Sequence, residues 1–314
     1  MEEKTKFPSW IIDVEKVDRS KLAQHSQEFF RKSLECYPHF HEIFLDCPKT
    51  SEIGVLTNHE PWVLEEHYEK STLIHFIIAN VAETFHYQFV YQIRELGLAM
   101  HGALDRGAFY TAAILNRSIF EAVCTSYYTF RRIEDKFKQS LVPLQIAAKT
   151  RSKVEQEKNI VKHYELLYEI YSLVHMANTA TTMNWTEHLK QFGYSIELPE
   201  PGKRLHVNDA IRDIEAKSKL PLWKVYNLMS EFVHPNFGSK TMIINTRRPY
   251  QKYMDVLVLG DNGGNAEAAL YYIDQFSESL YYTLTLACSL YGRSAKFLDD
   301  IFKFIPRPDN RTLH

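Results

Sequence analysis

Five polar side chains on two apolar helical segments are the strongest candidates for chemistry in this sequence. Arg117 and Glu121 stand on one segment, and Tyr226, Ser230 and His234 on another. Four residues turn a helix by about 400°, so the members of each set share one face. Polar groups on apolar helices need partners, and these two sets supply donors and acceptors in nearly equal number. We therefore expect a buried or cleft-lining polar cluster.

The role of this cluster has two main interpretations. In the structural one, the ion pair and its hydrogen bonds fix how two helices pack, as buried ionic groups do in other proteins. In the functional one, His234 is a general acid or base oriented by Tyr226 or Glu121, and Arg117 stabilises the charge of a phosphate. A third outcome is that the two segments never meet.

Pairs of glutamate and histidine at metal-ligand spacing suggest a different chemistry. Glu83 and His86 are three residues apart, as are Glu231 and His234. Di-metal carboxylate helical bundles use this spacing on two of their helices. The pattern is short enough to arise by chance, and Pro235 follows His234 at a predicted helix end. A di-metal bundle is thus the third functional alternative. For the leading interpretation we expect no bound metal or other cofactor.

A basic segment is the best candidate for contact with phosphate groups. Residues 131–162 carry nine Lys and Arg against four Asp and Glu, a local charge of +5 in a chain of net charge −2. Such a run is also typical of a solvated helix face. The near-neutral chain gives no general support for nucleic-acid binding, so RNA or a nucleotide is expected to bind only at a local site.

The elements that position these residues are predicted to be helices. The 314 residues include only 11 glycines and 12 prolines, about half the average share, and apolar residues recur at three- and four-residue steps. We expect a mainly α multi-helix bundle over 61–314, an N-terminal helical extension over 1–60, and a small β-hairpin near 241–259 with a basic, proline-containing turn. The predicted helices cover 21–35, 40–45, 61–100, 108–138, 143–175, 185–192, 207–218, 221–233 and 265–304.

Glycine and proline are expected to mark the joints between these helices. Glycines at 97, 102 and 107 separate the first two long helices, and Pro143 fits the first turn of the third. Prolines at 8, 38, 48 and 61 are expected to break up the N-terminal extension.

The composition is that of a soluble globular protein, with 45% hydrophobic and 24% charged residues. The four cysteines stand far apart, and Cys124 on an apolar helix is expected to belong to the core. The N-terminus lacks the apolar stretch of a signal peptide, and no window has the length of a membrane helix. We therefore expect a cytoplasmic protein with no membrane partner. Motifs of P-loop, serine-hydrolase, zinc-protease and kinase sites are missing from the sequence.

Two stretches of sequence carry a family resemblance. GALDRGAFYTAAILNRSIFEAVCTSYYTF is followed about 100 residues later by YNLMSEFVHPN. They resemble a group of bacterial all-helical proteins with an Arg-x-x-x-Glu helix and a Tyr-x-x-x-Ser-x-x-x-His-Pro segment, which is similar in turn to the HEPN superfamily. The resemblance covers residues 97–236. It implies a helical domain of a toxin–antitoxin or antiviral defence system, binding RNA or a nucleotide in a polar interhelical cleft, and association with a partner protein or into a homodimer.

The resemblance also raises the question of ribonuclease activity. Ribonucleases of the HEPN superfamily carry an Arg-x4–6-His motif, but positions 227–229 before His234 hold Asn, Leu and Met. Two other pairs match the spacing, Arg19 with His25 and Arg94 with His101, and about two matches are expected by chance. Ribonuclease activity with His234 as the acid–base residue therefore stays an open expectation, and a non-catalytic helical interaction or scaffold protein is the alternative.

Overall fold

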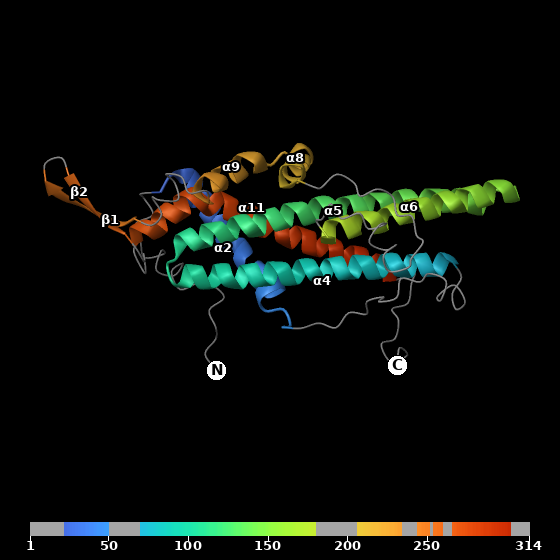
Figure 1. The fold of residues 1–314 in the computed structure, drawn as a ribbon, viewed down its shortest axis with the longest axis horizontal. Helices are drawn as coiled ribbons and strands as arrows, with labels where there is room; N and C mark the ends of the chain where they lie inside the picture. Colours follow the sequence, from blue (N-terminus) through green and yellow to red (C-terminus); the bar gives the residue numbers. More distant parts are fainter. Residues whose placement is uncertain are drawn as a thin grey trace, which may run out of the picture. The chain divides into compact units, whose positions relative to one another are not determined.

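The computed structural model of this chain describes residues 22–49, 70–179, 206–233, 244–251, 254–259 and 266–302 (Figure 1). These residues form seven α-helices, one π-helical turn and a two-stranded antiparallel hairpin. The prediction of a mainly α bundle is therefore confirmed. Among the described helices, none combines the length and apolar character needed to cross a bilayer.

Each described helix overlaps a helix that the sequence predicted, although several of the ends differ. The predicted helix over 185–192 and the boundary at residue 60 lie outside the described residues. The elements are α2 (Gln24–Phe40), the π-helix η2 (His41–Leu45), α4 (Lys70–Asp105), α5 (Phe109–Lys149), α6 (Lys153–Thr179), α8 (Val207–Ser218), α9 (Leu222–Val233) and α11 (Ala266–Phe302).

Contacts within the chain define two compact units, and the long helices α4, α5 and α11 each contribute to both. Unit 1 comprises Met1–Lys49, Phe89–Cys124 and Ile211–Leu290, and unit 2 comprises Thr50–Gln88, Thr125–Ala210 and Tyr291–His314. Each unit has a core of its own.

Buried side chains join α5, α9 and α11 in unit 1. Tyr272 stacks on Phe276 with ring centroids 5.1 Å apart, and Phe232 of α9 lies 5.0 Å from Phe276. The fully buried Asn116 of α5 donates from Nδ2 to Ser279 Oγ at 2.9 Å. Aromatic pairs of this kind add to the stabilisation from burial, and the polar contact fixes one register between α5 and α11.

The joint between α4 and α5 differs from the prediction. The glycines at 97 and 102 lie inside α4, which continues to Asp105, and only Gly107 has a positive φ, of 68°. A Cβ atom on Gly97 would lie 2.8 Å from Leu45 and 3.4 Å from Phe40. Gly97 therefore allows α4 to pack closely against α2 and η2, and Gly107 supplies the turn.

A second aromatic cluster forms the core of unit 2. The ring of Phe297 on α11 lies 5.5 Å from that of Phe130 and 5.3 Å from that of Phe137, both on α5. The buried His163 of α6 donates from Nδ1 to the carbonyl oxygen of Ser140 at 2.6 Å. These contacts hold α6 and the end of α11 against α5.

Two prolines lie inside helices that they were predicted to break or to begin. Pro38 lies within α2, and Pro143 lies within α5, which runs on to Lys149. A proline inside a helix removes one backbone hydrogen bond. In α5, Ser140, Pro143 and Ala147 are all buried at helical spacing, so the packing of this face outweighs the lost bond. The third predicted helix therefore begins at Lys153 and not at Pro143.

The predicted hairpin is confirmed, although its turn is not where the sequence suggested. Strand β1 (Ile244–Gln251) pairs antiparallel with β2 (Met254–Leu259), with Arg248 opposite Val256. The basic segment and Pro249 thus belong to β1 and not to the turn. The register shifts between Pro249 and Gln251, which is how a strand accommodates a residue without an N–H group.

Candidate functional site

Three of the five predicted residues meet at the contact between α5 and α9. Arg117 donates from Nε to Glu121 Oε1 at 2.8 Å and from Nη2 to the Tyr226 hydroxyl at 3.2 Å. Tyr226 donates in turn to Glu121 Oε1 at 3.0 Å. The three side chains close a ring of hydrogen bonds, which we call the Arg117 cluster. The expectation that the two segments meet in space is met for these residues.

An apolar platform holds the Arg117 cluster in place. Phe120 is fully buried, and its ring stacks on Tyr226 with centroids 6.4 Å apart. Trp223, one turn earlier on α9, lies 5.8 Å from Tyr226, and the Arg212 guanidinium of α8 lies 4.6 Å from the centroid of Trp223. The four-residue spacing of the polar residues and the burial of their neighbours explain why α5 and α9 present these groups together.

The electrostatics of the Arg117 cluster favour a charged arginine and a neutral tyrosine. Burial lowers the pKa of Arg117, but the hydrogen bond to Tyr226 and the charge of Glu121 outweigh it and raise the pKa. Burial is also the largest influence on Tyr226, and it raises the pKa of the phenol despite the opposing contact with Arg117. Arg117 therefore keeps its positive charge close to an aromatic surface.

The Arg117 cluster is only partly buried. The side chain of Arg117 is 15% exposed and that of Glu121 is 34% exposed. A guanidinium has five N–H donors, and Nη1 of Arg117 makes no hydrogen bond within the described part of the chain. The cluster thus retains donor capacity for an anionic ligand, which a fully enclosed ion pair would lack.

The other two predicted residues do not join the ring. Ser230 donates from Oγ to the carbonyl oxygen of Tyr226 at 2.8 Å, a bond that stays within α9. His234 lies outside the described residues, directly beyond the end of α9 at Val233. The proposed roles of both residues in chemistry therefore stay predictions.

A matching trio of residues occurs in unit 2, and no feature of the sequence predicts it. Arg293 of α11 donates to the Tyr127 hydroxyl at 2.8 Å and to a carboxylate oxygen of Glu134. Burial lowers the pKa of Arg293, and the contacts with Glu134 and Tyr127 raise it above its usual value. Because Arg293 is far from both partners in sequence, no short spacing points to this trio. It offers a matched control for the Arg117 cluster.

A third polar group, around His101, also escaped the sequence analysis. The hydroxyl of the buried Tyr37 lies 2.7 Å from His101 Nδ1, and His101 Nε2 lies 3.5 Å from a carboxylate oxygen of Asp105. The His41 ring is 5.8 Å from that of His101. Burial lowers the pKa of His101, and Asp105 opposes this effect. These contacts link α2 and η2 to α4 in unit 1.

The metal alternative gains no geometric support from the described residues, in which no three His, Cys, Asp or Glu side chains are placed to hold an ion. His86 is buried, and its Nδ1 lies 2.7 Å from Ser294 Oγ. Glu231 is exposed on α9. Cys124 is fully buried, and burial raises the pKa of its thiol, as expected for a core cysteine.

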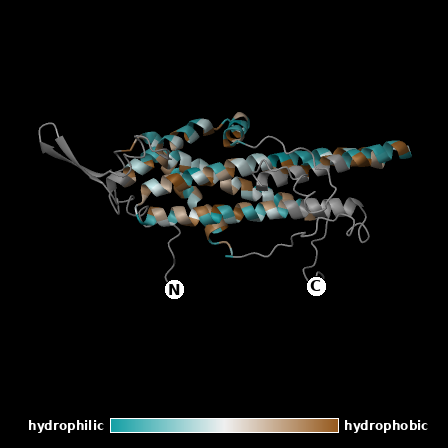
Figure 2. Cartoon of the chain, in the orientation of Figure 1, coloured by the Kyte–Doolittle hydropathy of each residue, from teal (hydrophilic) through white to brown (hydrophobic). Residues whose placement is uncertain are grey.

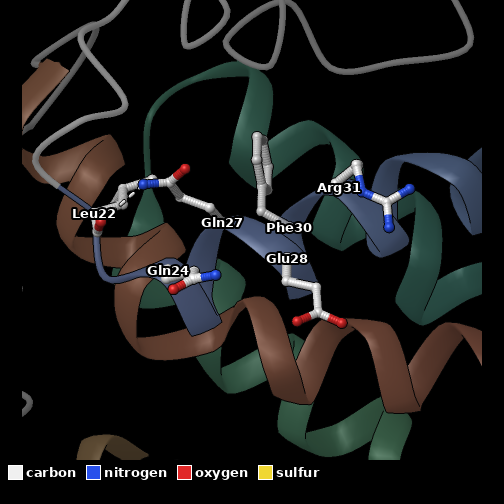
Figure 3. Close-up of a pocket in the computed structure, with 6 residues that line it drawn as sticks. All are labelled: Leu22, Gln24, Gln27, Glu28, Phe30 and Arg31. Carbon is white, nitrogen blue, oxygen red and sulfur yellow. Dashed lines mark hydrogen bonds between the residues drawn. The ribbon is translucent and has the colours of Figure 1, made fainter.

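A shallow hollow of about 360 Å³ lies along α2 (Figure 3). Gln27 donates from Nε2 to the carbonyl oxygen of Leu22 across it at 2.9 Å. The charged side chains that line it, Glu28 and Arg31, pair with Lys32 and Glu35 along the same helix. The hollow shares no residue with the Arg117 cluster, and its charged side chains are paired along α2, so it is a weak candidate for a ligand site.

Comparison with protein-family models, with curated proteins and with solved structures finds no match to this chain. The HEPN-like resemblance therefore depends on the two short motifs alone. Of the residues in those motifs, Arg117, Glu121 and Tyr226 come together in the fold.

Proposed function

We propose that this protein is a HEPN-like helical protein that binds RNA or a nucleotide at the Arg117 cluster. The observation that carries the proposal is the state of the Arg117 guanidinium. Two of its nitrogens are fixed by Glu121 and Tyr226, while Nη1 has no partner in the described residues. A guanidinium oriented in advance, with donors to spare, is well suited to a phosphate group.

The surroundings of the Arg117 cluster fit a nucleobase as well as a phosphate. Trp223 and Tyr226 are aromatic neighbours on α9, and Trp223 is partly exposed. Unpaired bases stack on aromatic side chains and on guanidinium planes. The exposed Arg212, which lies over Trp223, adds a second positive charge. These groups favour a single-stranded RNA or a nucleotide over a duplex.

Glu121 sets a limit on this affinity. Its carboxylate accepts hydrogen bonds at Oε1 from both Arg117 and Tyr226, so it places a negative charge beside the guanidinium. A phosphate at Nη1 is therefore attracted by Arg117 and repelled by Glu121. We expect modest affinity that depends on few phosphate contacts.

Cleavage of the bound RNA would need an acid–base residue, and His234 is the candidate because it follows the last described residue of α9. In this proposal Arg117 stabilises the charge on the phosphate and His234 transfers the proton. The defence role that the HEPN-like resemblance implies follows from such an activity.

The test is to measure binding of a fluorescein-labelled single-stranded RNA to the purified protein by anisotropy at 50 and 200 mM salt. Two or three phosphate contacts predict an affinity that falls roughly tenfold over this range. Incubation with total RNA, beside a His234→Ala variant, then shows whether cleavage occurs and needs the imidazole. If the unmutated protein neither binds nor cleaves RNA, the proposal fails.

A second candidate function is a non-catalytic interaction or scaffold protein. It is favoured by one observation, the closed ring of hydrogen bonds over the buried Phe120, which by itself suffices to lock α9 onto α5. The trio around Arg293 shows that this chain also uses the same three residue types elsewhere. If the protein is such a scaffold, disrupting the Arg117 cluster would lower the stability of the fold and leave any RNA affinity unchanged.

A further inference from the structure

The end of the hairpin formed by α5 and α6 gathers exposed aliphatic side chains. We define this hairpin end as residues 142–162; Figure 1 shows the two helices side by side, joined after Lys149. Of the seven large hydrophobic residues exposed in the described part of the chain, five lie here, and Figure 2 shows hydrophobic segments among hydrophilic ones at this end. They are Val142 (53% exposed), Ile146, Val154 (76%), Ile160 and Val161 (55%).

Neither helix propensity nor packing against the described part of the chain accounts for these residues. Valine and isoleucine are weaker helix formers than the straight-chain residues that usually cover exposed helix faces. On α6 the buried His163 marks the face turned toward α5. Val161 is two residues away, about 200° around the helix, and Val154 shares its face at a spacing of seven. These two valines therefore point away from the hairpin partner.

Five cations surround the exposed aliphatic residues. Within the described residues none of them forms an ion pair, whereas Lys136 and Lys138, nearer the core of unit 2, pair with Glu169 and Glu134. The hairpin end holds only two acidic residues, Glu155 and Glu157, so its net charge is +3. The unpaired cations are Lys149, Arg151, Lys153, Lys158 and Lys162.

The turn between the helices has its backbone groups largely satisfied. The Thr150 N–H donates to Ile146 O at 3.1 Å, and Gln156 donates from Nε2 to Thr150 O at 2.6 Å. The Gln156 N–H donates to Ser152 O at 3.0 Å. Backbone groups that are paired internally lose little when they enter a medium with less water.

Against the expectation of no membrane partner, we propose that the hairpin end docks into the headgroup region of an anionic phospholipid membrane. The directions of the exposed aliphatic side chains indicate what kind of partner binds here. Val142 and Ile146 share one side of α5 at a spacing of four, while Val154 and Val161 lie on the outer face of α6. A partner helix covers one apolar stripe, but a lipid interface surrounds an inserted tip and buries all of its sides together.

The cations complete the fit to an anionic surface. Lysine and arginine extend their charged groups to lipid phosphates while their aliphatic stems stay in the apolar layer. A polybasic segment with inserted aliphatic residues supplies the two attractions that reversible membrane binding needs. RNA would use the same charges but gains nothing from exposed valines, because bases stack on aromatic and not on aliphatic side chains. The lipid surface is therefore the ligand that accounts for both features.

The test uses the full chain and two kinds of vesicle, phosphatidylcholine alone and phosphatidylcholine with 30% phosphatidylserine, in a sedimentation assay. We expect binding to the anionic vesicles only. Removing three cations (Lys149→Gln, Arg151→Gln and Lys153→Gln) should weaken it about a hundredfold, since each basic residue near such a surface contributes roughly a fivefold gain. Removing three valines (Val142→Ser, Val154→Ser and Val161→Ser) should weaken it at least tenfold.

A matched control is Leu98→Ser, which removes an aliphatic side chain that is 39% exposed on α4 in unit 1; it should leave vesicle binding unchanged. All the substituted residues are exposed, and circular dichroism verifies that each variant keeps its helices. Two results would overturn the proposal. One is no sedimentation with anionic vesicles. The other is binding that needs the cations but is unaffected by the valine substitutions, which would assign the surface to a polyanion such as RNA.

Discussion

Replacing Arg117 with methionine is expected to lower the affinity for single-stranded RNA at least tenfold. Methionine keeps the apolar stem of the side chain but removes the guanidinium that we propose to contact phosphate. Hydrogen bonds to charged groups contribute about 1.5–3 kcal/mol, and each 1.4 kcal/mol corresponds to a factor of ten. Because the pair with Glu121 is partly exposed, we expect the stability loss to be about 1–2 kcal/mol. Fluorescence anisotropy and urea denaturation measure the two effects separately.

The control for Arg117→Met is Arg293→Met. Arg293 contacts a tyrosine and a glutamate in unit 2, as Arg117 does in unit 1. Both substitutions remove an ion pair and a tyrosine contact from the same residue types. Glu134 keeps its ion pair with Lys138, so we expect Arg293→Met to lower stability no more than Arg117→Met does. Only Arg117→Met should reduce RNA affinity. If Arg117→Met lowers stability and still binds RNA as well as Arg293→Met and the unmutated protein do, the Arg117 cluster stabilises helix packing only and the scaffold function is correct.

Acid is expected to destabilise the protein through His86. Burial lowers the pKa of His86 from its usual 6.5 to about 4. The unfolded chain therefore takes up a proton near pH 6.5 while the folded protein does not, so the stability contributed by the neutral imidazole is complete above pH 6.5 and falls as the pH drops toward 4. The shift corresponds to about 3 kcal/mol in the free energy of unfolding.

The measurement compares urea denaturation of the unmutated protein and of His86→Gln at several pH values between 7 and 4. Glutamine keeps a polar group near Ser294, which lies 2.7 Å from His86 Nδ1, and it does not titrate. Protonation of other groups, including His101, also lowers the free energy of unfolding in acid. Only the difference between the two curves therefore isolates His86. We expect this difference to change by about 3 kcal/mol across the range; curves that stay parallel would contradict the assignment.

Helical periodicity predicted where the long helices lie because their apolar residues repeat at three- and four-residue steps, but it placed the end of α5 and the start of α6 about ten residues too early. The bounds of α8, α9 and α11 follow the predicted ranges within a residue or two over the described residues. The joints were harder to predict, because proline and glycine have only local preferences. Pro143 lies inside α5, where packing of its face compensates for the missing hydrogen bond, and Gly97 lies inside α4 to allow a close approach.

The candidate site was predictable to the extent that it depends on spacing along one helix. Arg117 and Glu121 are four residues apart, so their ion pair follows from helix geometry. The contact with Tyr226 joins residues 109 positions apart, and only the motif resemblance suggested it. The trio around Arg293 and the contact between Tyr37 and His101 have neither short spacing nor a motif, so they emerge only from the tertiary fold.

The most direct test of the central claim, that the Arg117 cluster is a phosphate-binding site, is the RNA affinity of Glu121→Gln. This substitution removes the negative charge that contacts Arg117 and weakens the competing ion pair. If Arg117 binds phosphate, the variant should bind single-stranded RNA about three to ten times more tightly than the unmutated protein, even though it is less stable. An affinity that stays the same or falls, alongside the loss of stability, would contradict the claim.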